Sequence, residues 1–226
     1  MICPKLKPPS ATMLAFVVTD AAIKRPILEK IFNRCVEVSF NSITVDGDTS
    51  TNDTALVLAN GLSGNIEIAE EGPDAESFES MLQKVMLDLA KMMVKDGEGA
   101  TKFVELKIKG AKDDSDAKTA AFAIANSLLV KTAFFGSDTN WGRIIAALGY
   151  SGAEFDPKRV DLFYDDIQLV KDGQVLPGTQ TIQAEKITKR REFSITINLN
   201  NGPGSTTIYT SDLSYDYVKV NADYRS

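Results

Sequence analysis

The chain has 226 residues, a net charge of −6 and no histidine. Its length suffices for one large domain or two modest ones. The acidic balance disfavours nucleic acid as a partner, because phosphate backbones attract clustered Lys and Arg. Without histidine, a His-dependent triad and a His-ligated metal site are excluded within the chain. The two cysteines, Cys3 and Cys35, form no zinc-binding cluster, so we expect no metal.

Composition also favours a cytoplasmic protein. Apolar residues make up 43% and charged residues 25% of the chain, which is typical of soluble globular proteins. No apolar run reaches the roughly 20 residues of a membrane span, and no N-terminal segment reads as a secretory signal. Two cysteines argue against a disulfide scaffold and fit a reducing compartment. We therefore expect no membrane association.

The first hundred residues predict alternating strands and helices. Residues 13–18 read as a strand that is apolar on both faces and hence buried. Pro26 suits the first turn of a helix. Residues 42–45 and 55–59 read as strands around a polar loop at 46–54. Two helical stripes are predicted, one of Ile27, Ile31, Phe32, Cys35 and Val36, the other of Phe78, Met81, Leu82, Val85, Met86, Leu89 and Met93.

The rest of the chain continues the alternation, which predicts an α/β (α+β) fold of packed layers. The elements expected in chain order are a strand at 103–109, a helix at 116–126, a buried strand at 130–135, a helix at 140–148 capped by Asp138 or Thr139, a hairpin of 160–163 with 168–170, antiparallel strands at 193–199 and 206–210, and a last strand at 217–220. Two glycines in the loop 96–100 predict a boundary there. We expect a leader over 1–11, a core subdomain over 12–100 and a second α/β subdomain over 101–226.

Thr12 is the candidate nucleophile. It stands between a Pro-containing leader and the first strand, in Ala11-Thr12-Met13-Leu14-Ala15-Phe16. If the Ala11–Thr12 bond is cut, the new α-amine lies beside the Thr12 hydroxyl. Its pKa of about 7.7–8.0 suits a base, so one residue supplies both nucleophile and base. An Ala-Thr pair alone is more often a simple strand start, and other segments must agree.

Four further segments agree with the Ala-Thr segment. In chain order they are Ile43-Thr44-Val45-Asp46-Gly47-Asp48-Thr49-Ser50-Thr51-Asn52-Asp53-Thr54, Asp96-Gly97-Glu98-Gly99-Ala100-Thr101-Lys102, Thr139-Asn140-Trp141-Gly142-Arg143-Ile144, and the ending Tyr217-Val218-Lys219-Val220-Asn221-Ala222-Asp223-Tyr224-Arg225-Ser226. Together they closely resemble glutamate N-acetyltransferase, also called ornithine acetyltransferase, over residues 11–226. Members of that family are made as a precursor that cuts itself before the threonine of an Ala-Thr pair. The resemblance implies a self-processing, N-terminal-nucleophile-like fold, of which this chain is the nucleophile-bearing half.

The resemblance also assigns substrate-binding roles to Glu98, Asn221 and Ser226, beside Thr12. By itself, Glu98 between two glycines is a solvated turn carboxylate, and a terminal segment is usually frayed. Ser226 stands where the family has threonine and keeps the hydroxyl. Asx and Ser/Thr turns account for the loop 46–54, which we read as buried hydrogen bonding beside the site. Trp141 and Arg143 either cap the pocket or serve core packing and a surface ion pair.

The activity implied is acetyl transfer from N-acetylornithine to glutamate through an acetylated Thr12, without a cofactor. Acetyl-CoA is a further donor for some family members. The partner implied is the N-terminal half of the same precursor, in a heterotetramer of two α and two β chains. That half supplies the oxyanion hole. Six residues, 5–10, follow Pro4 before the Ala-Thr pair, where the family usually has two.

Two other functions remain open from the residues. An amide hydrolase or aminopeptidase of the same superfamily would use Thr12 with water as the acceptor. A non-catalytic subunit would keep the fold and never cut at Thr12.

Overall fold

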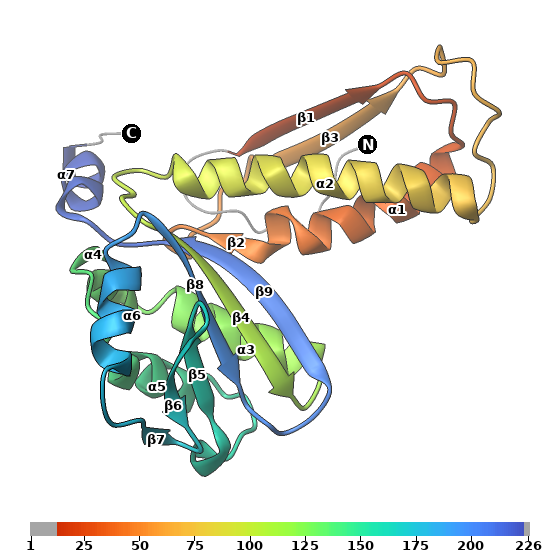
Figure 1. The fold of residues 1–226 in the computed structure, drawn as a ribbon. Helices are drawn as coiled ribbons and strands as arrows, with labels where there is room; N and C mark the ends of the chain where they lie inside the picture. The colour runs from red at the N-terminus through yellow and green to blue at the C-terminus, as the bar shows by residue number, and fades with distance from the viewer. Residues whose placement is uncertain (1–12, 224–226) are drawn as a thin grey trace. The chain divides into compact units, whose positions relative to one another are not determined.

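The computed structural model describes residues 13–223. The chain divides into two compact units, one extending to Met93 and one starting at Val94 (Figure 1). The elements of the first unit are β1 (Leu14–Thr19), α1 (Arg25–Val38), the 3₁₀ turn η1 (Phe40–Ser42), β2 (Ile43–Thr44), β3 (Thr54–Ala59) and α2 (Pro73–Lys95), whose last two residues fall in the second unit. The predicted strands and helices of this region are all present.

Strands β1 and β3 form a two-stranded parallel sheet. Ala15 lies opposite Ala55 in the register, and Phe16 lies opposite Leu56. One face is buried, with Ala15 and Ala55 at 4% and 1% exposure. The other face presents its apolar side chains to solvent: Leu14, Phe16, Val18 and Leu58. The expectation of a strand buried on both faces is therefore wrong for this chain on its own.

Helices α1 and α2 run side by side in the first unit (Figure 1). Pro26 lies in the first turn of α1, as predicted, and its whole predicted apolar stripe is buried. The buried face of α2 is rotated from the predicted one, because Met81 and Val85 are exposed. The buried residues of α2 are Ala75, Leu82, Met86, Ala90 and Val94.

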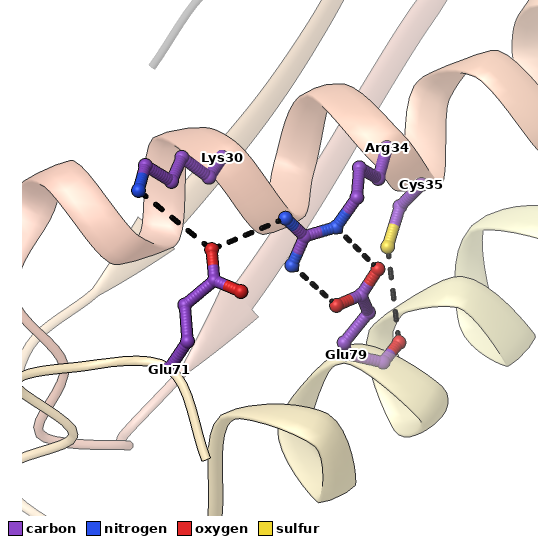
Figure 2. A network of polar contacts seen from close by, with 5 residues as sticks. All are labelled: Lys30, Arg34, Cys35, Glu71 and Glu79. Carbon is purple, nitrogen blue, oxygen red and sulfur yellow. Dashed lines mark hydrogen bonds and ion pairs between the residues drawn. The ribbon is translucent and has the colours of Figure 1, made fainter.

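A polar network fixes α1 against α2 (Figure 2). Arg34 binds Glu79 through two hydrogen bonds, from Nε over 2.7 Å and from Nη2 over 2.5 Å. Arg34 and Lys30 also reach Glu71, at 3.5 and 3.7 Å. The Cys35 thiol donates to the Glu79 carbonyl over 3.7 Å, and burial raises the pKa of that thiol to about 12. Cys35 thus has the packing role expected from its place on the stripe.

The second unit is a mixed sheet with helices on one face. Its elements are β4 (Phe103–Ala111), α3 (Asp114–Ala125), α4 (Leu128–Phe135), α5 (Trp141–Gly149), the 3₁₀ turn η2 (Pro157–Arg159), β5 (Asp161–Tyr164), β6 (Ile167–Lys171), β7 (Gln174–Val175), α6 (Gln180–Thr188), β8 (Glu192–Asn198), β9 (Gly204–Ser211) and α7 (Tyr215–Asp223). Its strands lie in the order β9-β4-β8-β5-β6-β7. The α/β architecture expected from the sequence is confirmed.

The core of this unit lies between the sheet and its helices. Along β4, Val104, Leu106 and Ile108 are fully or almost fully buried, while the alternate face carries Glu105 and Lys107, an ion pair of 2.9 Å. Helix α3 packs on β4 and β9, and α6 packs on β6 and β8. Strict alternation of apolar and charged residues along β4 thus predicts one covered face correctly.

Two predicted strands are helices. Residues 128–135 form α4, because the Ser127 hydroxyl caps the helix by accepting from the Val130 amide. Val130, Lys131, Ala133 and Phe134 then share its buried side. Such a short apolar run does not distinguish a strand from a buried helix by periodicity. Residues 215–223 form α7, so the last predicted strand, 217–220, is also wrong.

The pairing of β8 and β9 also differs from the prediction. The two strands flank Asn201-Gly202-Pro203-Gly204, a turn signal that predicts an antiparallel pair, but β4 lies between them. Strand β8 pairs with β4 in parallel, and β9 pairs with β4 antiparallel. The hairpin of β5 and β6 is confirmed. Sequence reasoning missed α6 and the short β7. None of the helices formed by residues 13–223 has the length and apolar character of a membrane span.

Candidate functional site

Met13, which follows the predicted nucleophile Thr12 in the sequence, is the first residue that the structure describes. Ala11, Thr12 and Ser226 lie outside the described residues. Met13 is buried, and its amide donates to Asp53 Oδ1 over 2.8 Å. Its carbonyl accepts from the Thr54 amide over 2.7 Å. Asp53 and Thr54, which are consecutive residues, thus bind the amide and the carbonyl of Met13. These two hydrogen bonds hold the start of β1.

Asp53 is a residue that sequence reasoning missed as an individual. Its second carboxylate oxygen accepts from the Ser50 amide over 2.9 Å, so it also closes its own loop. Most of the loop is exposed, which corrects the expectation that it is buried. Its hydrogen bonding to Met13 is nevertheless found where the sequence placed it, next to Thr12. An Asp directly before a strand, in Asn52-Asp53-Thr54, was the available signal.

Glu98 and Asn221 are brought together in the second unit. The Asn221 amide nitrogen donates to Glu98 Oε2 over 2.8 Å, across 123 positions of sequence. The same nitrogen donates to the Tyr217 carbonyl over 3.0 Å, one turn earlier in α7. Glu98 is half-buried and Asn221 is exposed, so the carboxylate has a fixed direction and still faces solvent. Such a carboxylate is suited to hold a cationic group such as an ammonium.

The loop that carries Glu98 depends on glycine. Gly99 has φ +65°, in the left-handed region that glycine adopts without strain. A Cβ at Gly99 would overlap the Tyr217 backbone nitrogen and lie 2.8 Å from Ser214 Oγ. The loop therefore packs directly against the start of α7. This close approach explains the glycine after Glu98, which the sequence alone left as a turn residue.

Trp141 and Arg143 lie in the first turn of α5, in the second unit. Asn140, and neither Asp138 nor Thr139, is the N-cap of α5, because its side chain accepts from the Arg143 amide. Arg143 donates to the Leu129 carbonyl over 2.9 Å and so ties α5 to α4. Trp141 is 37% exposed. In the part of the chain that the structure describes, neither Trp141 nor Arg143 forms a hydrogen bond with Glu98.

Within residues 13–223, no three His, Cys, Asp or Glu side chains are grouped as metal ligands. A shallow cavity of about 320 Å³ opens in the first unit, with a lining that is mostly aliphatic: Ile23, Arg25, Leu28, Val57, Leu58 and Ala59. Neither Glu98 nor Asn221, the predicted site residues that the structure describes, lines this cavity.

Known proteins match the chain over nearly its whole length. The ArgJ family model matches residues 1–226. The arginine biosynthesis bifunctional protein ArgJ of Geobacter sulfurreducens is 56% identical over 98% of the chain. A glutamate N-acetyltransferase of Methanocaldococcus jannaschii is 52% identical over 99% of the chain. The chain spans 56% of the length of each of these two relatives.

A solved structure supports the fold directly. The crystal structure of the arginine biosynthesis bifunctional protein ArgJ from Bacillus halodurans superposes with a TM-score of 0.89 at 42% identity. The match covers 94% of this chain and 100% of that chain. The resemblance inferred from the four sequence segments is therefore confirmed, together with the fold class: the chain belongs to the ArgJ family.

Proposed function

We propose that this chain is the nucleophile-bearing half of an acetyltransferase that moves acetyl from N-acetylornithine to glutamate. One observation carries the proposal: a relative named glutamate N-acetyltransferase is 52% identical over 99% of the chain. The paired Glu98 and Asn221 side chains support it, because a directed carboxylate suits substrates that carry an α-ammonium or an amine.

The proposed reaction is a double displacement. The Thr12 hydroxyl attacks the acetyl carbon of N-acetylornithine while the Thr12 α-amine takes its proton. The C–N bond breaks, and ornithine leaves with that proton on its amine. The neutral amine of glutamate then attacks the Thr12 ester, the Thr12 α-amine carries a proton from that nitrogen to the Thr12 oxygen, and the C–O bond breaks to release N-acetylglutamate and restore the hydroxyl. Each step needs donors for the oxyanion, each worth about 3–4 kcal/mol.

The anchoring of Met13 supports Thr12 as a nucleophile. Attack requires that the hydroxyl be held within a fraction of an ångström of its productive position. The Met13 amide and carbonyl are both hydrogen-bonded, to Asp53 and Thr54. The backbone that directly follows Thr12 in the sequence is therefore anchored, which supports the proposed role. Glu98, Asn221 and Ser226 are proposed to bind the amino-acid part of the substrates.

We propose that the partner is the N-terminal half of the same precursor, which would supply the oxyanion donors. The apolar face of β1 and β3 supports this. Phe16 is 60% exposed and Val18 71% exposed, on a sheet of only two strands. Two strands are marginal without further packing. An apolar face of this kind marks an interaction surface.

Assembly, cofactor and compartment complete the proposal. We expect a heterotetramer of two copies of each half, to be tested by native mass spectrometry. The double displacement requires no cofactor, and acetyl-CoA is a second donor to be assayed. The buried free thiol of Cys35 suits a reducing compartment, so we place the enzyme in the cytoplasm.

Co-expression of the chain with the corresponding N-terminal half tests the proposal. The expected product is a chain that begins at Thr12, together with transfer of acetyl from N-acetylornithine to glutamate. Thr12→Ala should abolish both cleavage and transfer. Release of acetate to water in place of transfer would instead support an amide hydrolase, and an uncut, inactive complex would support a non-catalytic subunit.

A further inference from the structure

The loop that carries Glu98 is fastened to the β9–α7 connection at two points. Asp212 fastens its far end. Asp212 Oδ1 accepts from the Thr101 and Lys102 amides, each over 2.8 Å, and Oδ2 accepts from the Thr101 hydroxyl over 2.5 Å. Asp212 is 3% exposed. These three bonds hold the end of the loop where β4 begins.

Ser214 fastens the part of the loop next to Glu98. Its hydroxyl donates to the Gly99 carbonyl over 2.6 Å and accepts from the Tyr217 amide over 3.2 Å. One hydroxyl thus caps α7 and binds the residue that follows Glu98. The absence of a Cβ at Gly99 permits this approach, since a Cβ would lie 2.8 Å from Ser214 Oγ.

Lys131 of α4 anchors the connection between β9 and α7. Lys131 is 1% exposed, and its amine donates to the Ser211 carbonyl and to Thr210 Oγ1. The Lys131 carbonyl accepts from the Leu213 amide over 3.2 Å. The residues on either side of Asp212 are therefore both bonded to one buried residue. Lys131 thus anchors the segment that carries Asp212 and Ser214.

We propose that Ser214 is a positioning residue for Glu98. Glu98 meets Asn221 only if the loop and α7 keep their relative placement, and Ser214 is the group that bonds both. Its hydroxyl transmits the position of α7, which carries Asn221, to the backbone beside Glu98. This inference rests on the proposed function, in which Glu98 binds the amino-acid substrate. Ser214 itself is not proposed to touch substrate.

Ser127 offers a matched control. It caps α4 in the same unit, and its hydroxyl accepts from the Val130 amide. Removing either hydroxyl takes away a helix cap, but Ser214→Ala alone removes the bond to Gly99. The two changes thus separate a general loss of capping from a loss of Glu98 placement.

Kinetics of the co-expressed complex form the first test. Ser214→Ala should raise the KM for glutamate about tenfold, equivalent to about 1.4 kcal/mol, with little change in kcat. Ser214→Thr keeps the hydroxyl and should stay within about twofold of the parent, and Ser127→Ala should match the parent. Equal KM values in Ser214→Ala and Ser127→Ala would overturn the proposal.

A double-mutant cycle tests whether Ser214 acts through Glu98. If it does, Ser214→Ala should raise KM far less in a Glu98→Gln background than in the parent, because coupled residues are not additive. A full tenfold rise in both backgrounds would show that Ser214 acts by another route.

Hydrogen exchange separates this inference from the proposed function. In the complex without substrate, the amides of residues 99–102 should exchange faster in Ser214→Ala than in Ser127→Ala. If the parent complex transfers no acetyl, the proposed function fails, and exchange still decides the anchor. Unchanged exchange at these amides would overturn the anchoring role in either case.

Discussion

Asn221 donates from its amide nitrogen to Glu98 Oε2 over 2.8 Å and thereby joins helix α7 to the loop after α2. The donor is uncharged, so the pair keeps a net negative charge. A second acceptor, the Tyr217 carbonyl, fixes the amide of Asn221. Asn221 therefore fixes the direction of the Glu98 carboxylate without neutralising it, so that its charge can bind a cationic group of a ligand.

Neutralising this carboxylate should damage substrate binding selectively. Glu98→Gln keeps size and shape but removes the charge, and the expected loss is about 1.5–3 kcal/mol in binding or transition-state free energy. Stability should change by less than about 0.5 kcal/mol, because Glu98 is only half-buried and glutamine keeps an oxygen that accepts from Asn221. Steady-state kinetics and a urea denaturation curve measure the two. Equal transfer rates for Glu98→Gln and the parent would remove Glu98 from the site.

Asp53→Ala should release the Met13 amide next to the nucleophile. We expect slower self-cleavage at Ala11–Thr12 and slower acetyl loading of Thr12, by about tenfold for the loss of one charged hydrogen bond. The gel-resolved rate of precursor cleavage measures the first effect. Asp48→Ala, which removes an exposed carboxylate from the same loop, is the control. Identical cleavage rates in the two variants would show that the Asp53 bond to Met13 does not matter for Thr12.

Acid should weaken the contact between α1 and α2. The hydrogen bonds from Arg34 lower the pKa of Glu79 below its ordinary 4.5. A carboxyl with a lowered folded pKa stabilises the fold above its unfolded pKa, and this contribution disappears as pH falls through the folded value. Glu79→Gln should therefore cost about 0.5–1 kcal/mol near pH 7 and nothing well below pH ~4.

Urea midpoints of the parent and of Glu79→Gln, measured near pH 7 and well below pH ~4, give this difference. Glu71→Gln is the control, because Glu71 is exposed and lies 3.5 Å from Arg34 at its nearest. A destabilisation by Glu79→Gln that is the same at both pH values would contradict the assignment to an ion pair.

Phe16→Thr should weaken association with the N-terminal half. Threonine keeps β propensity while removing most of the apolar area that Phe16 exposes. We expect the complex to dissociate on dilution at a concentration at least about tenfold higher, measured by size-exclusion chromatography. Ile66→Thr, at a residue 89% exposed outside the β1–β3 face, is the control. Matching dissociation of both variants would place the partner elsewhere.

The sequence predicts elements where local signals are strong. The stripe of α1, the alternation along β4 and the hairpin of β5 and β6 each carry a clear period, and each is confirmed. Residues 130–135 and 217–220 were too short for a period to be decisive, and the serine before each, Ser127 or Ser214, was the overlooked helix signal.

Tertiary relationships were less accessible. The bond between Glu98 and Asn221 spans 123 positions, and only the family resemblance placed both residues in one site. The insertion of β4 between β8 and β9 depends on competition among strands, which a turn signal does not report. The sequence did not distinguish Asp53 from the other polar residues of its loop. Its role depends on its contact with Met13 and not on its residue type.

The acetyl intermediate on Thr12 tests the central claim most directly. The co-expressed, processed complex is incubated with N-acetylornithine in the absence of glutamate, quenched in acid and analysed by peptide mass spectrometry. The account predicts one acetyl group on the peptide that begins with Thr12, discharged by added glutamate much faster than by water. A complex that transfers acetyl without ever carrying it on Thr12, or one whose Thr12→Ala variant transfers at the parent rate, would contradict the account.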